Sequence, residues 1–142
     1  MKRPAASFCV IVMAFLFGCS KGPACNDADV RKLVLDISRE KVKIELAKRV
    51  LVASIYMPQL YGIKKEVSGE ENLKQISHIA DELMKQSEIN LSGVRTKSRY
   101  DTLRRCDCEA NLDFKADVYE GSLQIKYTAS YAEGGKIKVE LK

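Results

Sequence analysis

The stretch of sequence that decides the fold is Cys106-Asp107-Cys108-Glu109-Ala110-Asn111-Leu112-Asp113-Phe114-Lys115-Ala116-Asp117-Val118. Apolar or small side chains alternate with polar, mostly acidic ones along its whole length. Successive side chains of a β-strand point to opposite faces, so this period of two predicts a strand that buries one face and leaves the other in water. Half-buried strands of this kind are typical of antiparallel sheets.

Three further segments are expected to form strands beside this one. Residues 123–131 and 137–141 alternate in the same way and are joined by turns that contain glycine. Another strand is predicted over 89–96, followed by a polar turn over 97–105. Because each segment is separated from the next by a short connection, the four strands are expected to form an antiparallel meander.

Two helical segments precede the strands. From Asn26 the chain has no glycine or proline until Pro58, and a first line of apolar residues falls on one helical face: Val30, Leu33, Val34, Ile37, Ile44, Leu51 and Ile55. A second amphipathic segment covers 69–86. In the latter half of the first helix, Val42, Leu46 and Val50 form a second apolar line on the opposite side from the first. We expect the sheet and the second helix to cover both lines, and the alternative is that Val42, Leu46 and Val50 form an interaction stripe. Helices followed by strands predict an α+β fold, with two N-terminal helices packed on a four-stranded antiparallel meander sheet.

The N-terminus carries a secretion signal. Lys2 and Arg3 precede an apolar run from Phe8 to Phe17, which is long enough for a signal peptide and too short to span a bilayer as a helix. The run ends in Leu16-Phe17-Gly18-Cys19, an aliphatic, variable, small and cysteine pattern that resembles the lipobox of bacterial lipoproteins. The alternatives are a conventional signal peptide with an ordinary cysteine after it, or an N-terminal membrane helix.

The lipobox resemblance implies a lipid-anchored protein. Cys19 would carry a diacylglycerol thioether and, after cleavage, an acyl chain on its new amino group, and two or more chains hold a protein stably at a membrane. The expected organisation is a signal peptide over 1–18, a lipidated cysteine and tether over 19–25, and one α+β domain over 26–142. Ser20 follows the cysteine where enterobacterial lipoproteins of the inner membrane usually have Asp, which favours the outer membrane.

The cysteine count fits a single disulfide. The signal removes Cys9 and the lipid uses Cys19, which leaves Cys25, Cys106 and Cys108. In the oxidising envelope an odd number implies one disulfide with a free thiol, or an intermolecular bridge. A bridge from Cys25 to the strand would tie the start of the first helix to the sheet, but spacing leaves open which strand cysteine is used. With one histidine in the chain, a zinc or other metal site is not expected.

Segments across the mature chain carry a second resemblance. They are Cys25-Asn26-Asp27, Ile89-Asn90-Leu91-Ser92-Gly93-Val94-Arg95-Thr96, Cys108-Glu109-Ala110-Asn111-Leu112 and Ile125-Lys126-Tyr127-Thr128. These segments look like a group of small periplasmic lipoproteins in which one cysteine precedes the first helix and another lies in a Cys-x-Ala-x-Leu strand. The resemblance implies a Cys25–Cys108 disulfide and leaves Cys106 as a free thiol. It implies no activity.

No motif for catalysis or cofactor binding is present. The single histidine, His78, lies opposite the apolar face of the second helix, as solvated surface residues do. The chain has no HExxH zinc motif, nucleophile elbow or phosphate-binding glycine loop. Loss of Lys2 and Arg3 with the signal lowers the net charge by two from +5, and so mild a charge does not favour nucleic acid. We expect no catalytic residue, no cofactor and no nucleic-acid partner.

These observations predict a lipid-anchored periplasmic lipoprotein that acts by binding rather than by catalysis. Its anchor contacts the membrane through Cys19, and its body is expected to bind a protein or another envelope component. One alternative is an immunity or inhibitor protein against a periplasm-active toxin or lysozyme. Another is a structural subunit of a secretion, conjugation or envelope-assembly complex that uses Val42, Leu46 and Val50 as its contact stripe.

Overall fold

The computed structural model describes residues 22–59, 62 and 69–142 of the chain, so the predicted signal peptide and Cys19 lie outside the described residues. Within them, two helices precede four strands and one short 3-10 turn. The elements are α1 (Ala28–Tyr56), α2 (Gly69–Lys85), β1 (Glu88–Tyr100), β2 (Arg105–Ala116), β3 (Tyr119–Tyr131), η1 (Glu133–Gly135) and β4 (Ile137–Leu141). The strands pair in the order β1-β2-β3-β4, and each neighbouring pair is antiparallel. The predicted α+β fold with a meander sheet is confirmed.

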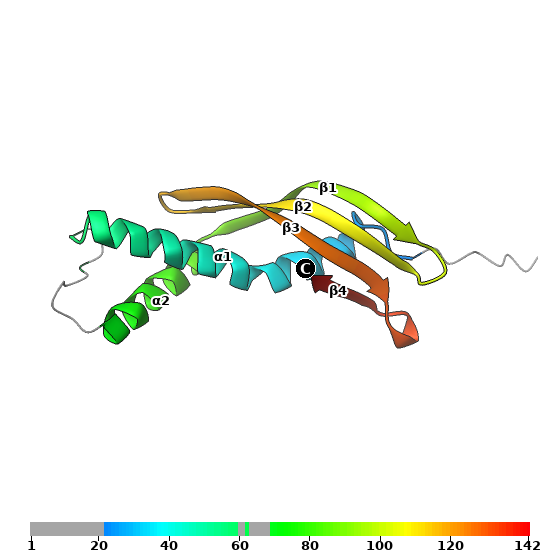
Figure 1. The fold of residues 1–142 in the computed structure, drawn as a ribbon, viewed down its shortest axis with the longest axis horizontal. Coiled ribbons are helices and arrows are strands. Elements are labelled where there is room, and N and C mark those ends of the chain that lie inside the picture. The colour runs from blue at the N-terminus through cyan, green and yellow to red at the C-terminus, as the bar shows by residue number, and fades with distance from the viewer. Residues whose placement is uncertain (1–21, 60–61, 63–68) are drawn as a thin grey trace, which may run out of the picture.

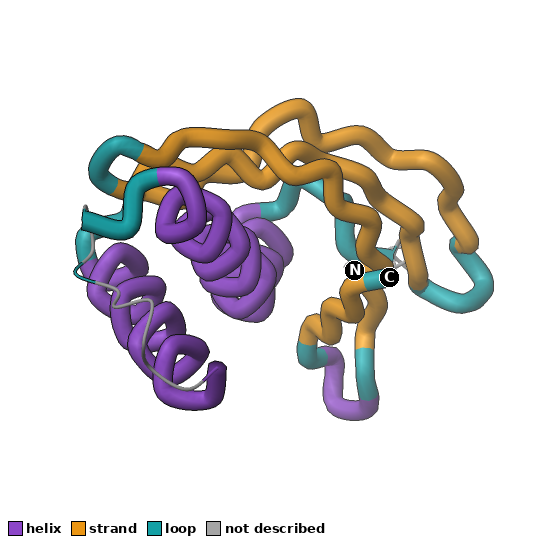
Figure 2. The backbone as a smooth tube through the Cα atoms, turned by 60° about the vertical axis from the view of Figure 1, so that its left-hand side comes forward, coloured by secondary structure: helices purple, strands orange, loops and turns teal. Residues whose placement is uncertain are grey.

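The helices cover one face of a curved sheet. Helix α1 contacts all four strands and lies between α2 and β4, while α2 packs mainly on α1 (Figures 1 and 2). The opposite face of the sheet carries no helix of the described residues (Figure 2). No helix in the described part of the chain is long and apolar enough to cross a membrane.

Strand β2 supplies the centre of the core, as its alternation predicts. The inward side chains from Cys106 to Ala116 are all buried, and Leu112 is completely so. Tyr127 on β3 and Leu46 on α1 are the largest fully buried side chains that pack with them. Val118 departs from the pattern, because it lies beyond the end of β2 in the turn and is 73% exposed.

The second apolar line on α1, the candidate interaction stripe, belongs to the core. Val42, Leu46 and Val50 are each 0% exposed, so they offer no surface to a partner. The buried positions of α1 follow one another four residues apart, from Val30 to Ser54. A four-residue step exceeds the helical turn of 3.6 residues, so this line winds around α1 by about 40° per step. It therefore faces the sheet and then turns toward α2.

Strand β1 is longer than its sequence pattern indicates. It was predicted to end at Thr96, and it continues to Tyr100, which pairs with Arg105 on β2. The added residues 97–100 are exposed, so no alternation of apolar and polar side chains marks them as a strand. Two register shifts interrupt the β1–β2 pairing, and Gly93 has a φ of 57° at the first of them, a conformation that favours glycine.

Candidate functional site

A disulfide joins the segment before α1 to the middle of the sheet. Cys25 and Cys108 form the bond across 83 residues of sequence, with their Cα atoms 5.8 Å apart. Both cysteines are buried. This is the pairing that the resemblance to small lipoproteins implied, and it holds the start of α1 against β2.

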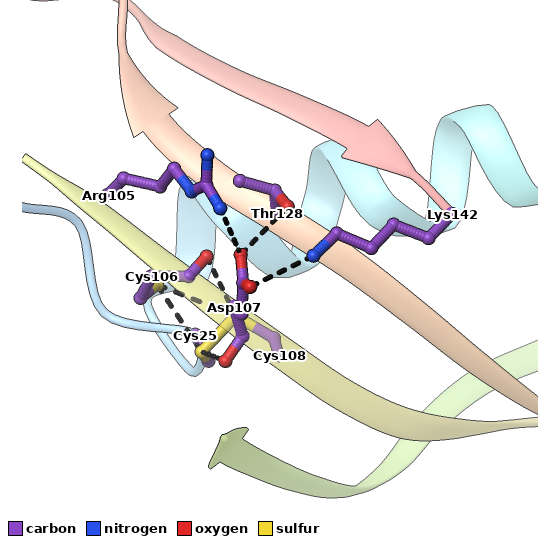
Figure 3. Close-up of polar contacts among 7 residues, drawn as sticks. All are labelled: Cys25, Arg105, Cys106, Asp107, Cys108, Thr128 and Lys142. Carbon is purple, nitrogen blue, oxygen red and sulfur yellow. Dashed lines mark hydrogen bonds and ion pairs between the residues drawn. A yellow bond between two sulfur atoms is a disulfide. The ribbon is translucent and has the colours of Figure 1, made fainter. Parts of the chain in front are cut away.

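The third cysteine lies directly against this disulfide, and the three residues form what we call the sulfur cluster (Figure 3). The Sγ atom of Cys106 is 3.3 Å from that of Cys25 and 3.5 Å from that of Cys108. Because the two distances are nearly equal, the thiol lies beside the S–S bond and not along its extension, where a thiolate would attack it. Cys106 is free and buried.

The environment of Cys106 keeps its thiol protonated. Burial raises the pKa of the Cys106 thiol, and its S–H group donates a hydrogen bond to the carbonyl oxygen of Pro23 at 3.0 Å. The thiolate is the reactive form of cysteine, so a buried neutral thiol is a poor nucleophile and a poor metal ligand. Although the three sulfur atoms lie within 4.8 Å of one another, two of them are joined in the disulfide and provide no thiolate.

The predicted tether is docked on the body from Gly22 onward. Gly22, Pro23 and Cys25 are buried, although the domain was expected to begin at residue 26. Arg99 donates a hydrogen bond to the Gly22 carbonyl at 2.9 Å, and the Tyr127 hydroxyl donates one to the Cys25 carbonyl at 2.8 Å. Burial raises the pKa of Tyr127 to about 12, so this hydroxyl remains a donor at any physiological pH.

Gly22 fits this position because the chain passes very close to the start of β2. A Cβ atom on residue 22 would lie 2.5 Å from the backbone carbon of Arg104. Such a contact is far shorter than two carbon atoms tolerate, so only glycine allows this approach without movement of the backbone. This close approach therefore holds Gly22 against the start of β2.

On the outward side of β2, Asp107 is the centre of a polar network (Figure 3). Its carboxylate lies 2.9 Å from Lys142 Nζ and 3.4 Å from Arg105 Nη2, and it accepts a hydrogen bond from the Thr128 hydroxyl at 3.0 Å. The hydrogen bond from Lys142 lowers the pKa of Asp107, with further lowering by Thr128 and Arg105 against the opposing effect of burial. This carboxylate is held ionised by three donors and is not poised to carry a proton.

The acid stability of the protein is expected to depend on this carboxylate. Because its folded pKa lies below the ordinary value of 3.8, its contribution to stability is complete above that value and is lost as the pH falls through the folded pKa. Asp107→Asn is therefore expected to lower the free energy of unfolding at neutral pH. Below about pH 4, the free energy of unfolding of this variant is expected to fall less steeply with pH than that of the wild-type protein. Urea unfolding midpoints between about pH 2 and 7 measure this.

The matched control for this prediction is Asp36→Asn. Asp36 is exposed on α1 and has no ion pair among the residues that the structure describes. A parallel decline with pH in the Asp107 variant and the wild-type protein would show that the network does not stabilise the folded state.

The other outward acids of β2 are also satisfied by neighbouring strands. Glu109 is only 7% exposed because Arg95 and Lys97 cover it, at 3.0 and 3.6 Å from its carboxylate oxygens. Asp113 accepts hydrogen bonds from the hydroxyls of Ser92 and Ser122. These acids pair across strands, as their positions on an outward face suggest.

His78 lies on α2, which packs mainly on α1 and not on the sheet. It is exposed on α2, and the nearby Glu82 forms an ion pair with Lys85 at 2.6 Å. The structure thus brings the sulfur cluster and Asp107 together on two sides of β2 and leaves His78 elsewhere on the molecule.

A line of exposed apolar side chains runs along α1, and we call it the α1 stripe. Its members lie along one line of the helix beside the buried positions, and their exposed fractions range from 40% to 65%. They are Ile37, Ile44, Leu51 and Ile55. The sequence pattern contained these residues, but it assigned them to the core because periodicity shows that a face is apolar without showing what covers it.

Two features adjoin the α1 stripe. Lys41 and Lys48 are exposed on α1, and neither has an ion pair among the described residues. Near the C-terminal end of the helix, Val52, Tyr56 and Met57 are each more than half exposed and line a shallow groove. Among the described residues, the stripe, the lysines and this groove form one exposed surface of α1.

Comparison of the chain with models of known families, with curated proteins and with solved structures finds no match.

Proposed function

We propose that the protein is a bacterial lipoprotein, anchored through lipid on Cys19 and facing the periplasm, whose body binds a protein partner without catalysing a reaction. The lipobox pattern Leu16-Phe17-Gly18-Cys19 supports the anchor. The Cys25–Cys108 disulfide supports an oxidising compartment, because such bonds are rare in the cytosol. Ser20 after the lipidated cysteine favours the outer membrane over the inner one.

The α1 stripe is the observation that carries the binding role. Ile37, Ile44 and Leu51 recur every seven residues, and with Ile55 they extend over about 27 Å of helix. A large isoleucine or leucine left in water forgoes roughly 1.5–3 kcal/mol of burial free energy, so a continuous line of them marks a surface that is covered in use. A seven-residue repeat is the spacing at which a second helix packs alongside.

The charges beside the stripe indicate the kind of partner. Lys41 and Lys48 repeat at the same seven-residue interval and have no acidic partner among the described residues. A partner helix with an apolar stripe flanked by Asp or Glu would pair with both features. The acidic groups on the outward face of β2 are already paired, so they do not compete for such a partner.

The stripe is tested by capture of partners with the full lipidated chain, expressed with its own signal and extracted from membranes in detergent after crosslinking. The double variant Ile44→Glu/Leu51→Glu is expected to lose the partner that the wild-type protein captures, because it places two carboxylates on the stripe. The control is Leu73→Glu, which puts a carboxylate on an exposed apolar position on α2, outside the α1 stripe.

The result that contradicts the proposal is an equal yield of the same partner from the stripe variant and the wild-type protein. Loss of the partner in the Leu73 variant alone would also contradict it, because it would move the contact to α2. The identity of a stripe-dependent partner separates the two narrower roles: a toxin or lysozyme indicates immunity, and a channel or assembly component indicates a structural subunit.

A further inference from the structure

The β1–β2 hairpin ends in an exposed apolar tip. The turn is closed by hydrogen bonds from Leu103 N to the Tyr100 carbonyl and from Arg104 N to the Asp101 carbonyl, at 3.2 and 3.1 Å. Leu103 is 63% exposed and Tyr100 is 39% exposed. Turns of this kind usually carry small or polar residues, so a leucine and a tyrosine at the tip are unusual.

Arginines surround this tip. Arg104 is exposed at the turn and has no ion pair among the described residues, while Arg105 lies over the Tyr100 ring at 5.0 Å. Arg99 is paired with Asp101 at 3.2 Å. An apolar side chain, an interfacial tyrosine and surrounding arginines are the combination that suits the boundary between lipid headgroups and acyl chains.

The docked tether places the anchor beside the same tip. Gly22 contacts the hairpin through the Arg99 hydrogen bond and lies against the backbone of Arg104. Cys19 is only three positions before Gly22, and three residues span at most about 11 Å. The described chain begins at the end of the molecule that holds the β1–β2 hairpin, and the opposite end holds the turn from β2 to β3 (Figure 1).

We propose that the β1–β2 hairpin is a second membrane contact, in which Leu103 and Tyr100 enter the headgroup region and Arg104 binds anionic lipid phosphates. This rests on the proposed lipidation of Cys19, which brings the hairpin to the bilayer. The two contacts fix the orientation of the body, with the β1–β2 hairpin at the membrane and the C-terminal end of α1 directed away from it. The α1 stripe then extends outward from the membrane, where a periplasmic partner reaches it.

The absence of tryptophan from the chain makes a direct test available. Leu103→Trp and Val118→Trp each introduce one reporter at an exposed apolar position, and the two positions lie on turns at opposite ends of the molecule. The lipidated full chain carrying either reporter is reconstituted in vesicles of phosphatidylethanolamine and phosphatidylglycerol with brominated acyl chains. Bromine quenches tryptophan fluorescence only when the indole approaches the acyl region.

The inference predicts that the fluorescence at position 103 is quenched at least about twofold more than at position 118, with a shift to shorter wavelength. Adding Arg104→Glu to the Leu103 reporter is expected to reduce this quenching in vesicles that contain phosphatidylglycerol, because the phosphate contact is lost.

Three outcomes would overturn the inference or its premise, and they are distinguishable. If the mass shows the lipid on Cys19 and the two positions are quenched equally, the hairpin does not contact the membrane although the anchor is present. A shift to shorter wavelength at position 103 without bromine quenching indicates a protein contact at the tip and also overturns it. A protein without lipid on Cys19 overturns the proposed function itself.

Discussion

Replacing Cys25 by serine is expected to lower the free energy of unfolding by about 4–5 kcal/mol, because the Cys25–Cys108 bond closes a loop of more than 80 residues. The bond restricts the unfolded chain, and in the folded state it holds the docked segment and the start of α1 against β2. A domain of this size has a total stability of about 5–15 kcal/mol, so the variant is expected to be barely folded at 37 °C.

Because the Cys106 thiol lies beside the disulfide, the loss in Cys25→Ser can be compared with the losses in Cys108→Ser and Cys106→Ser. In Cys108→Ser, the Cys106 thiol lies close enough to Cys25 for a bond to form between them when the protein is made in an oxidising compartment. That variant is expected to retain most of the stability that Cys25→Ser loses. Cys106→Ser keeps the native disulfide and is expected to change stability by about 1 kcal/mol or less.

Denaturant unfolding of the three variants, with peptide mapping of the disulfide, measures these effects. The free energy of unfolding is expected to be nearly the same in the wild-type protein and in Cys106→Ser. It is expected to be lower in Cys108→Ser and lowest in Cys25→Ser. Equal losses in Cys108→Ser and Cys25→Ser, with no Cys25–Cys106 bond in the peptide map, would contradict the arrangement of the sulfur cluster.

Leu46→Ala is expected to cost about 2–5 kcal/mol of stability, whereas Ile44→Ala, two positions away on α1, is expected to cost about 0.5 kcal/mol or less. Leu46 is fully buried between α1 and the sheet, and shortening it leaves a cavity that the surrounding side chains fill only partly. Ile44 is 48% exposed, so folding removes little of its apolar surface from water and little is lost when the side chain is shortened. Urea unfolding of the two variants compares them directly.

This pair of variants also tests which apolar line on α1 is free for a partner. Similar losses in both would mean that Ile44 is covered within the protein and that the α1 stripe is not a surface. A small loss for Leu46 and a large one for Ile44 would restore Val42, Leu46 and Val50 as the exposed line.

The sheet could be predicted from sequence because its central strand buries only one face. Each inward side chain of β2 is apolar or small and each outward one is polar, so Leu112 and Asp113 already specify the two sides of the sheet. The register then follows from short turns between neighbouring strands. The sequence pattern misses two stretches of the sheet. One is the end of β1 from Lys97 to Tyr100, where both faces are polar or open to solvent, and the other is the start of β3 from Tyr119 to Ser122, where Gly121 suggests a turn.

The roles of the two apolar lines on α1 could not be predicted in the same way. A helix with apolar residues on opposite sides gives two candidates for the buried face, and the choice depends on where the twisted sheet and α2 lie. Val42 and Ile44 are equally apolar in sequence, yet one is fully buried and the other is 48% exposed. The docking of Gly22 also had no sequence signal, because a glycine beside a proline is typical of a flexible linker.

The mass of the mature protein, purified from the membranes of a bacterial host that makes it with its own signal, is the most direct test of the central claim. We predict a chain that begins at Cys19 and carries a diacylglycerol group on the thiol and an acyl chain on the amino group, while Cys19→Ala accumulates as the uncleaved precursor. A chain cleaved at another residue, or one that begins at Cys19 without added lipid, would contradict the claim that this domain is held at the membrane by its N-terminal cysteine.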